Sequence, residues 1–449
     1  MKPFRSAIAL AGTIAMASCS GMTGANPAIP AGAAAPSAMH AASGHQSNVR
    51  KVCPDAKPGF AQCFALVRTD AFYANAPDYR ATLDITPENA AAAAAKGFYG
   101  PLGAAQLQQA YNLPSSTAGS AQTVAIVDAY DDPTAESDLA QYRSQFKLPP
   151  CTSADGCFRK LNQKGAASPL PLKDGNWSGE ISLDLDMVSA ICPKCHIVLV
   201  EANSNAMKDL ALSESAAHGA GANVISNSYG GGECGLNQSG RVACSSPLPL
   251  AKYYKIAKTV VTASSGDNSW FAGPQSPADF GTVVAVGGTS LYSANNSRGW
   301  LETAWSNAGS GCSRFVKRPS WIPASTGCKN DMRAIADVSA VADPFTGVLV
   351  YQTYPATRGG LYVYGGTSAA SPIVAATYAL AGNAASQNYG TSLYKAPKGS
   401  LTDVLVGANG IIGLGNNAGQ QCAPINICTA MPGWDGPTGN GTAFGVKAF

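Results

Sequence analysis

Charged residues are scarce in this chain, at 13% of 449 residues, whereas soluble proteins usually have about 25%. Lys plus Arg number 30 and Asp plus Glu number 27, so the formal net charge of +3 gives no electrostatic case for binding nucleic acid or an anionic membrane surface. The sequence has no internal repeat, which excludes collagen-like and other fibrous classes. Its length suits one large domain with an appendage, or two domains. So few charges also suit acidic surroundings, because the net charge changes little as carboxylates protonate.

The amino terminus has the pattern of an export signal over residues 1–19. Lys2 and Arg5 precede an apolar run over residues 7–17, which is too short to span a bilayer as a helix. The residues up to Cys19 then resemble a bacterial lipobox, in which the cysteine is lipidated, and plain cleavage is the alternative. We therefore expect an exported protein that is secreted or anchored to a bacterial envelope membrane through Cys19. No later segment is long and apolar enough to be a membrane span.

Composition divides the rest of the chain into three parts. Residues 20–50 are rich in Ala, Gly, Pro and Ser without a hydrophobic period, which predicts a flexible tether. Residues 51–97 are interpreted as a short pro-segment or N-terminal extension. Residues 98–449 are predicted to form the main folded domain.

Twelve of the 13 cysteines follow Cys19 and fall into pairs of near neighbours. An even number with short spacings in an exported protein predicts local disulfides. Cys192 and Cys195 form a CxxC that could instead be a redox motif or half of a zinc site, but a second CxxC and a thioredoxin-like context are absent. The predicted pairs are Cys53–Cys63, Cys151–Cys157, Cys192–Cys195, Cys234–Cys244, Cys312–Cys328 and Cys422–Cys428.

Apolar runs alternate with helical patterns from about residue 120 onwards. Strands are predicted over residues 123–128, 196–201, 223–226, 259–262 and 282–286. Helices are predicted over residues 136–145, 177–190, 207–219 and 249–257. This alternation is typical of an α/β domain with a parallel sheet. Ligand chemistry is then expected at the carboxyl ends of the strands.

A glycine-rich turn precedes Ser368 in the segment Gly365–Pro372, which reads GGTSAASP. The glycines allow a tight turn from a strand into a helix. Ser368 then lies at a helix N-terminus, where backbone N–H groups and the helix dipole can stabilise an oxyanion. A glycine-rich turn with a capping serine is the alternative interpretation.

A nucleophilic serine needs a base, and the chain has only four histidines. His40 and His45 lie in the predicted tether. His196 opens an apolar strand, and His218 ends a helix, where its charge interacts favourably with the helix dipole. This shortage directs the search to carboxylates.

Two carboxylates in the predicted helix, Glu180 and Asp184, are four residues apart and share one face. Such a pair shares a proton, which raises one pKa and makes a base for serine in acid. A solvated acidic face is the alternative interpretation of this pair. Asp186 points to the other side of the helix and is interpreted as a structural residue.

Asp267 follows Ser-Ser-Gly at the end of a predicted strand. When protonated it can donate a hydrogen bond to an oxyanion, or it is an ordinary turn residue.

Together these segments resemble the sedolisins, or serine-carboxyl peptidases. The resemblance rests on Glu180 and Asp184 in EISLD, Asp267 in SSGD and Ser368 in GGTSAASP, and it covers about residues 98–449. It implies a subtilisin-like three-layer α/β domain with a mostly parallel central sheet and flanking helices. A turn shared with subtilisins surrounds the serine, whereas the Glu-x-x-x-Asp helix and the Gly-Asp are specific to sedolisins.

The resemblance also implies a role for each residue. Ser368 would be the nucleophile, and Glu180 the general base and then the acid for the leaving amine. Asp184 would orient Glu180, and Asp267 would stabilise the oxyanion. The implied activity is that of an endopeptidase that cleaves peptide or protein substrates at acidic pH. We expect the protein to be a monomer.

A further segment, SNSYGG over residues 226–231, resembles the lining of the substrate cleft in that superfamily. Within it, Ser226, Tyr229 and Gly230 are the expected substrate contacts. Sedolisins usually carry a long folded prodomain, whereas only a short stretch precedes residue 98 here.

A calcium site is implied by two C-terminal pieces, Thr402–Val404 and Pro432–Asp435. Carboxylates and backbone carbonyls make the hard oxygen site that suits Ca²⁺. The family has Gly at the position of Met431. Methionine still offers its backbone carbonyl as a ligand, but it alters the dihedral angles of the turn. The implied ligands are the carboxylates of Asp403 and Asp435 and the carbonyls of Val404, Met431 and Gly433.

Two other interpretations remain open. A subtilisin-type triad would use Asp128, His218 and Ser368; Asp128 ends the first strand, but His218 comes too late in the order of elements. A surface lipoprotein could instead keep the peptidase fold and bind a partner without turnover. An esterase is disfavoured because no Gly-x-Ser-x-Gly elbow surrounds Ser368.

Overall fold

A computed structural model describes residues 48–76, 101–236, 242–355, 358–410, 422 and 424–449. The predicted export signal with Cys19, most of the predicted tether and the second half of the predicted pro-segment lie outside these residues. Across the described ranges, no helix combines the length and hydropathy needed to cross a membrane.

A mostly parallel sheet forms the centre of the described chain. Its order is β20-β21-β17-β13-β11-β7-β4-β6-β5, and β14 pairs with β13 in antiparallel orientation. Both faces of this sheet are buried, and its inner strands are therefore nearly continuous apolar runs. The strands are β4 (Thr123–Ala129), β5 (Phe158–Asn162), β6 (His196–Ala202), β7 (Val224–Asn227), β11 (Val260–Ser264), β13 (Val284–Ser293), β14 (Trp300–Ala304), β17 (Val338–Val341), β20 (Leu401–Thr402) and β21 (Thr442–Ala443).

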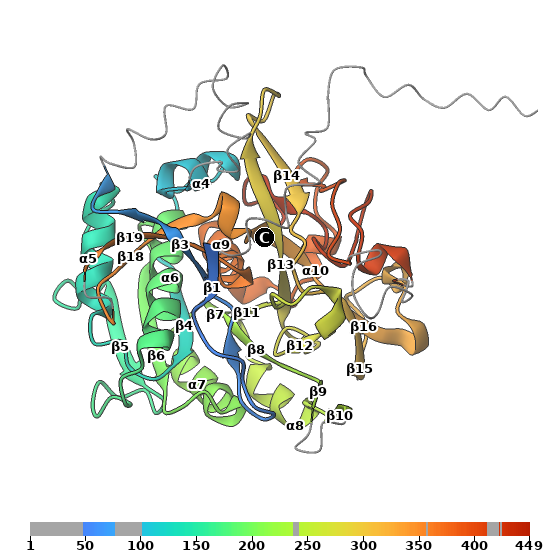
Figure 1. Cartoon of the computed structure of the whole chain (residues 1–449), viewed down its shortest axis with the longest axis horizontal. Coiled ribbons are helices and arrows are strands. Elements are labelled where there is room, and N and C mark those ends of the chain that lie inside the picture. Colours follow the sequence, from blue (N-terminus) through green and yellow to red (C-terminus); the bar gives the residue numbers. More distant parts are fainter. Residues whose placement is uncertain (1–47, 77–100, 237–241, 356–357, 411–421, 423) are drawn as a thin grey trace, which may run out of the picture. The chain divides into compact units, whose positions relative to one another are not determined.

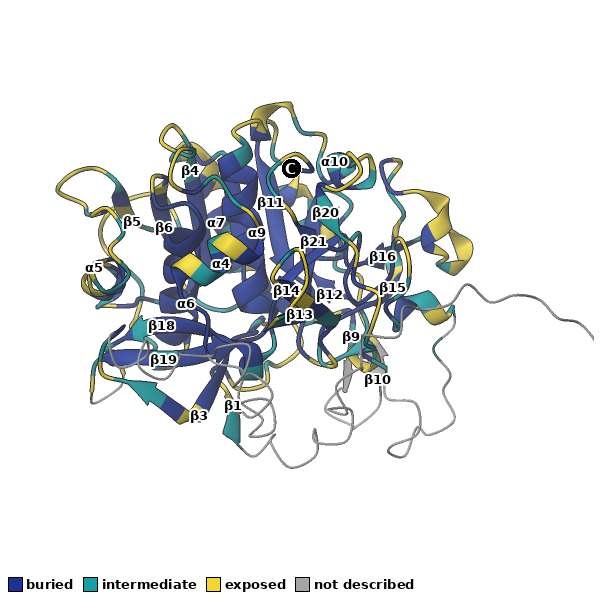
Figure 2. Cartoon of the chain, turned by 90° about the horizontal axis from the view of Figure 1, so that it is seen from above, coloured by how far each residue is buried: buried dark blue, intermediate teal, exposed yellow. Residues whose placement is uncertain are grey.

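Two buried helices carry the residues of greatest interest. α6 (Gly175–Ile191) packs against α9 (Thr367–Ala381), and Figure 2 shows both deep in the molecule. Asp174 caps α6 by accepting hydrogen bonds from the backbone N–H groups of Asn176 and Trp177. The other helices are α4 (Ala104–Ala110), α5 (Ala135–Gln145), α7 (Met207–Gly219), α8 (Leu248–Ala251) and α10 (Thr391–Tyr394).

Residues 48–76 pair with strands of the main domain on two sides. β1 (Val49–Lys51) and β3 (Leu66–Tyr73) join β19 (Gly360–Gly365) and β18 (Val348–Gln352) in an antiparallel sheet, order β1-β3-β19-β18 (Figure 1). β2 (Gln62–Cys63) pairs with β8 (Tyr229–Gly232), which also pairs with β12 (Gln275–Ser276). Two further pairs are β9 (Cys234–Leu236) with β10 (Val242–Cys244) and β15 (Gly311–Lys317) with β16 (Met332–Ile335).

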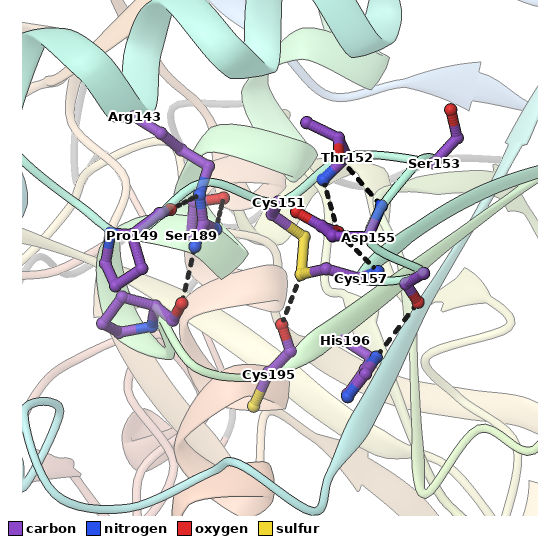
Figure 3. Close-up of a disulfide and its surroundings, with 12 residues drawn as sticks. Arg143, Pro149, Cys151, Thr152, Ser153, Asp155, Cys157, Ser189, Cys195 and His196 are labelled. Atoms are coloured by element: carbon purple, nitrogen blue, oxygen red, sulfur yellow. Dashed lines mark hydrogen bonds between the residues drawn. A yellow bond between two sulfur atoms is a disulfide. The ribbon is translucent and has the colours of Figure 1, made fainter.

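All six cysteine pairs predicted from spacing are disulfides in the structure. Cys192 and Cys195 are bonded to each other and fully buried, as expected of a structural disulfide. Figure 3 shows the Cys151–Cys157 bond beside Arg143, whose buried guanidinium donates to the Pro149 carbonyl at 2.6 Å and to Ser189 Oγ at 2.9 Å. Arg143 thereby ties the disulfide loop to the end of α6.

Two predicted elements have different bounds in the structure. The helix predicted over residues 249–257 is only α8 followed by a 3₁₀ turn over Lys252–Tyr254, because Lys255 leaves the helical conformation and Tyr254 turns into the core. The strand predicted over residues 282–286 continues to Ser293, because β17 and β14 pair with successive parts of it.

Candidate active site

Ser368 is the second residue of α9, directly after the turn that leaves β19. Gly366 makes this turn with φ +94°, a conformation that favours glycine. A Cβ on Gly366 would also lie 1.8 Å from the carbonyl oxygen of Phe64, so no larger residue fits. Ser368 is fully buried, and its Oγ donates to the Ser228 carbonyl at 3.0 Å.

Glu180 and Asp184 lie on α6, and both are fully buried. Burial raises the pKa of Glu180 well above its usual range, and the nearby Asp184 raises it further. The Ser368 hydroxyl beside Glu180 and the Ala65 N–H, which donates to Oε2 at 2.9 Å, lower that pKa only in part. Glu180 is therefore a buried carboxyl of raised pKa in contact with the serine.

Asp184 is held in place by the Ser228 hydroxyl, which donates to its Oδ1 at 2.8 Å. Burial raises its pKa well above the usual range, and the charge of Asp128 adds to this effect. Ser228 was not singled out from the sequence as a site residue. It nevertheless connects the two helices, because its carbonyl accepts from Ser368 and its hydroxyl donates to Asp184.

Asp128 is a third carboxyl at this site. It lies in β4, fully buried, and neither oxygen has a hydrogen-bond partner among the described residues. Burial raises its pKa well above the usual range, and the charges of Glu180 and Glu201 raise it further. The sequence analysis considered Asp128 only as a partner of His218, although an Asp at the end of a wholly apolar strand was a usable signal. Three buried carboxyls so close together cannot all be ionised at once.

Asp267 follows β11 and faces the turn before Ser368. Its Oδ1 accepts hydrogen bonds from the Thr367 N–H at 2.8 Å and the Thr367 hydroxyl at 2.7 Å. Its buried Oδ2 has no hydrogen-bond partner among the described residues, and a Cβ on Gly366 would come within 2.6 Å of it. Burial raises the pKa of Asp267 to about 7, against the lowering effect of Thr367. Below that pH, Oδ2 can carry a proton and donate it into the cleft.

The structure separates His218 from this cluster. His218 is exposed at the end of α7, where its Nδ1 lies 3.2 Å from the Thr259 hydroxyl. Ser368 is buried against Glu180 instead. Asp186 turns away and accepts the Tyr351 N–H at 2.8 Å, which ties α6 to β18.

The three predicted substrate contacts have different surroundings. The Ser226 hydroxyl lies 3.0 Å from that of Ser371 beneath α9. The Tyr229 hydroxyl donates to Asn227 Oδ1 at 2.6 Å, inside the core. Gly230 lies in β8, and its backbone pairs with that of Gln62.

The predicted calcium ligands lie in two neighbouring loops. Asp403 Oδ2 accepts the Gly433 N–H at 2.9 Å, and Asp435 Oδ2 accepts the Met431 N–H at 3.1 Å. Burial raises the pKa of Asp435 to about 7, and the charge of Asp403 adds to this. Within the described ranges, no three His, Cys, Asp or Glu side chains form a metal cluster. A site here would therefore depend on backbone carbonyls, which fits a hard cation next to two close carboxylates.

Comparison with known proteins identifies the class. Residues 173–397, half of the chain, match the subtilase family. The chain belongs to this family, with a subtilisin-like fold, as the sequence predicted.

Its relatives are sedolisins. It is 29% identical over 386 residues to kumamolisin from Bacillus sp. (strain MN-32), covering 79% of this chain and 63% of that protein. It is 34% identical over 182 residues to sedolisin from Pseudomonas sp. (strain 101), covering 37% and 28%. The chain thus spans less than two thirds of either relative. The solved structure of Pseudomonas sedolisin, a serine-carboxyl proteinase complexed with two molecules of pseudo-iodotyrostatin, has a TM-score of 0.61 and 25% identity, over 77% of this chain and 95% of that one.

Proposed function

We propose that this chain is a serine-carboxyl endopeptidase that hydrolyses peptide bonds at acidic pH. The observation that carries this proposal is the meeting of Ser368 with the buried carboxyls of Glu180 and Asp267. The relatives support a serine-type peptidase of the sedolisin kind. Six disulfides support the proposal that the protein is exported, because disulfides persist in oxidising compartments.

In the proposed mechanism, the reactive form has the proton shared by the carboxyl pair on Asp184, which leaves Glu180 ionised. Ser368 Oγ then attacks the carbonyl carbon of the substrate while Glu180 takes its proton. Protonated Asp267 donates a hydrogen bond from Oδ2 to the developing oxyanion. Glu180 then passes the proton to the leaving amine, and in the second half it activates the water that hydrolyses the acyl-enzyme. Asp184 keeps Glu180 oriented and tunes its basicity.

This mechanism predicts an acidic optimum. Asp267 has a pKa of about 7, so it loses its proton as the pH rises through neutrality. The hydrogen-bond donor at the oxyanion position then becomes a negative charge that repels the intermediate. Cleavage of a denatured protein, followed by mass spectrometry from pH 3 to 8, should therefore peak below pH 6 and disappear in Ser368→Ala. A peak at neutral pH would contradict the carboxylate mechanism and favour a subtilisin-type triad that includes His218.

A second candidate function has one observation in its favour. The cleft contains residues of the chain itself, since Ala65 and Phe64 contact Glu180 and Gly366. A binding protein that keeps the fold without turnover would show such a blocked site permanently. It predicts that the folded chain cleaves nothing at any pH.

We further propose a structural Ca²⁺ ion. It would be held by Asp403 and Asp435 with the carbonyls of Val404, Met431 and Gly433, and its charge would offset the repulsion between the two carboxylates.

Chelation should therefore destabilise the protein. Removing calcium with EGTA should lower Tm, because an ion present at a hundred times its Kd stabilises the folded state by about 2.7 kcal/mol. Differential scanning calorimetry of Ser368→Ala with and without calcium measures this difference. The variant Asp403→Asn should abolish it, whereas Asp331→Asn, at an exposed carboxylate elsewhere, should preserve it. Equal Tm values in both buffers would contradict the site.

A further inference from the structure

Residues 61–67 lie against the candidate catalytic groups, between β8 and β19. On one side of Ser368, Gln62 and Cys63 pair with Gly230 and Tyr229 of β8 in antiparallel register. On the other side, the segment continues as β3, which pairs with β19 in antiparallel register. A peptide substrate bound across a serine peptidase cleft makes the same kind of backbone pairing.

The peptide bond between Phe64 and Ala65 lies at the catalytic groups. The Ala65 N–H donates to Glu180 Oε2 at 2.9 Å, which places the nitrogen against the group that would protonate it. The Phe64 carbonyl oxygen and Asp267 Oδ2 both lie against Gly366, 1.8 Å and 2.6 Å from the point where a Cβ would stand. The carbonyl of Ser228 accepts both the Phe64 N–H, at 3.2 Å, and the Ser368 hydroxyl, at 3.0 Å. The nitrogen thus meets the proposed acid, the carbonyl oxygen lies near the proposed oxyanion donor, and the nucleophile shares a hydrogen-bond acceptor with the residue before the bond.

The side chain of Phe64 fills a pocket that two glycines leave open. A Cβ on Gly230 would lie 2.8 Å from the Phe64 ring, and one on Gly266 would lie 3.6 Å from it. Gln275 borders the same space, because its side chain lies within 3.0 Å of both of these Cβ positions. Phe64 is 2% exposed and the small Ala65 is 1% exposed. The pocket therefore fits a bulky aromatic residue before the bond, with a small residue after it.

We propose that residues 61–67 are an internal substrate of this site, that Ser368 cuts the Phe64–Ala65 bond, and that the same pocket selects aromatic residues in other substrates. This inference rests on the proposed peptidase function. Ser368 Oγ bonds to the Phe64 carbonyl carbon while its proton moves to Glu180. The carbon–nitrogen bond then breaks as that proton passes to the Ala65 nitrogen. Water hydrolyses the ester, which leaves a Phe64 carboxyl group, an Ala65 amine and the restored serine.

Both halves of the cut chain stay bound to the domain. The first half is held by β1 on β3, by β2 on β8 and by the Cys53–Cys63 disulfide. The Val52 N–H also donates to the Ala65 carbonyl at 2.9 Å, across the cut. The second half remains as β3 on β19. The first fragment consequently blocks the cleft until it dissociates, so other substrates are cut only after a lag.

The test follows the Phe64–Ala65 bond in the full chain at pH 4. Because the halves stay associated, intact mass and N-terminal sequence are measured after denaturation. Wild type should acquire a new N-terminus at Ala65, and Ser368→Ala should remain uncut. Phe64→Ala should self-cleave at least tenfold more slowly, since it removes the group that fills the pocket. The matched control is Phe60→Ala, at an exposed phenylalanine four residues earlier, which should be cut at the wild-type rate.

Synthetic peptides keep the test decisive if a Phe64 variant does not fold. One peptide has the sequence of residues 60–69 with Ser for Cys63, and a second also has Ala for Phe64. Wild type should cut the first between the residues corresponding to Phe64 and Ala65, and the second at least tenfold more slowly.

Three outcomes would overturn the inference. If the protein digests denatured protein but leaves its own Phe64–Ala65 bond intact, the internal substrate is wrong and the peptidase function stands. If the bond breaks equally in Ser368→Ala, the active site is not responsible. If the folded protein cuts neither itself nor any added substrate, the proposed function itself fails.

Discussion

Replacing Glu180 with glutamine is expected to lower kcat/KM by about 10⁴-fold, in line with the loss of a triad member in serine peptidases. Glutamine has nearly the same shape but cannot accept the Ser368 proton. The contact with the Ala65 N–H remains possible through the amide oxygen, so the fold should be preserved. The measurement is initial-rate cleavage of a fluorogenic peptide at pH 4, with circular dichroism to confirm folding.

Asp186→Asn provides the matched control on the same helix. Asp186 is equally buried on α6, but it bonds to the Tyr351 N–H of β18 and not to the serine. Its replacement should leave kcat/KM close to the wild-type value. Comparable losses in both variants would show that helix integrity, and not proton transfer by Glu180, determines the rate.

The free energy of unfolding should fall as the pH rises from about 4 to 8. Burial raises the pKa of Asp267 to about 7 and those of Glu201 and Glu214 to about 8. In the unfolded chain such groups ionise near pH 4, so between these values the folded state binds more protons. Stability then decreases with rising pH, by up to about 1.4 kcal/mol per pH unit for each group. The stabilisation is fully present below about pH 4, decreases as the pH rises, and has been lost once each group ionises in the folded state.

Urea unfolding of Ser368→Ala at constant calcium, from pH 4 to 8, measures this slope without self-digestion. Glu214→Gln should reduce it, because glutamine stays neutral and Glu214 is buried on α7. The control Asp55→Asn, at an exposed carboxylate, should leave the slope unchanged. A stability maximum at neutral pH would contradict the protonated state of these buried carboxyls.

Local patterns in the sequence were enough to predict the elements that carry the site. The alternation of apolar runs with helical segments depends on neighbouring residues, and β4, β6 and α7 lie close to their predicted bounds. The spacing of Glu180 and Asp184 specifies one helix face in the same way. Short cysteine spacings leave few alternative partners, so the six pairs were predictable.

The proximity of Asp128 to Glu180 could not be predicted from local sequence patterns. Its position at the end of an apolar strand was visible in the sequence, but its contact with Glu180 depends on how α6 packs over β4. The shortened α8 is a similar case, because Tyr254 is drawn into the core by tertiary packing.

The sequence by itself determined the fold class, the disulfide pairs and which residues resemble a serine-carboxyl site, since all of these depend on short spacings or motifs. Only the tertiary structure decided that Phe64 and Ala65 occupy the cleft. Ala65 meets Glu180 across 115 residues of sequence, and Phe64 reaches Gly366 across a still longer separation. Such contacts form only once β2 and β3 have paired with β8 and β19, because that register is set by strand edges that exist in the folded domain alone.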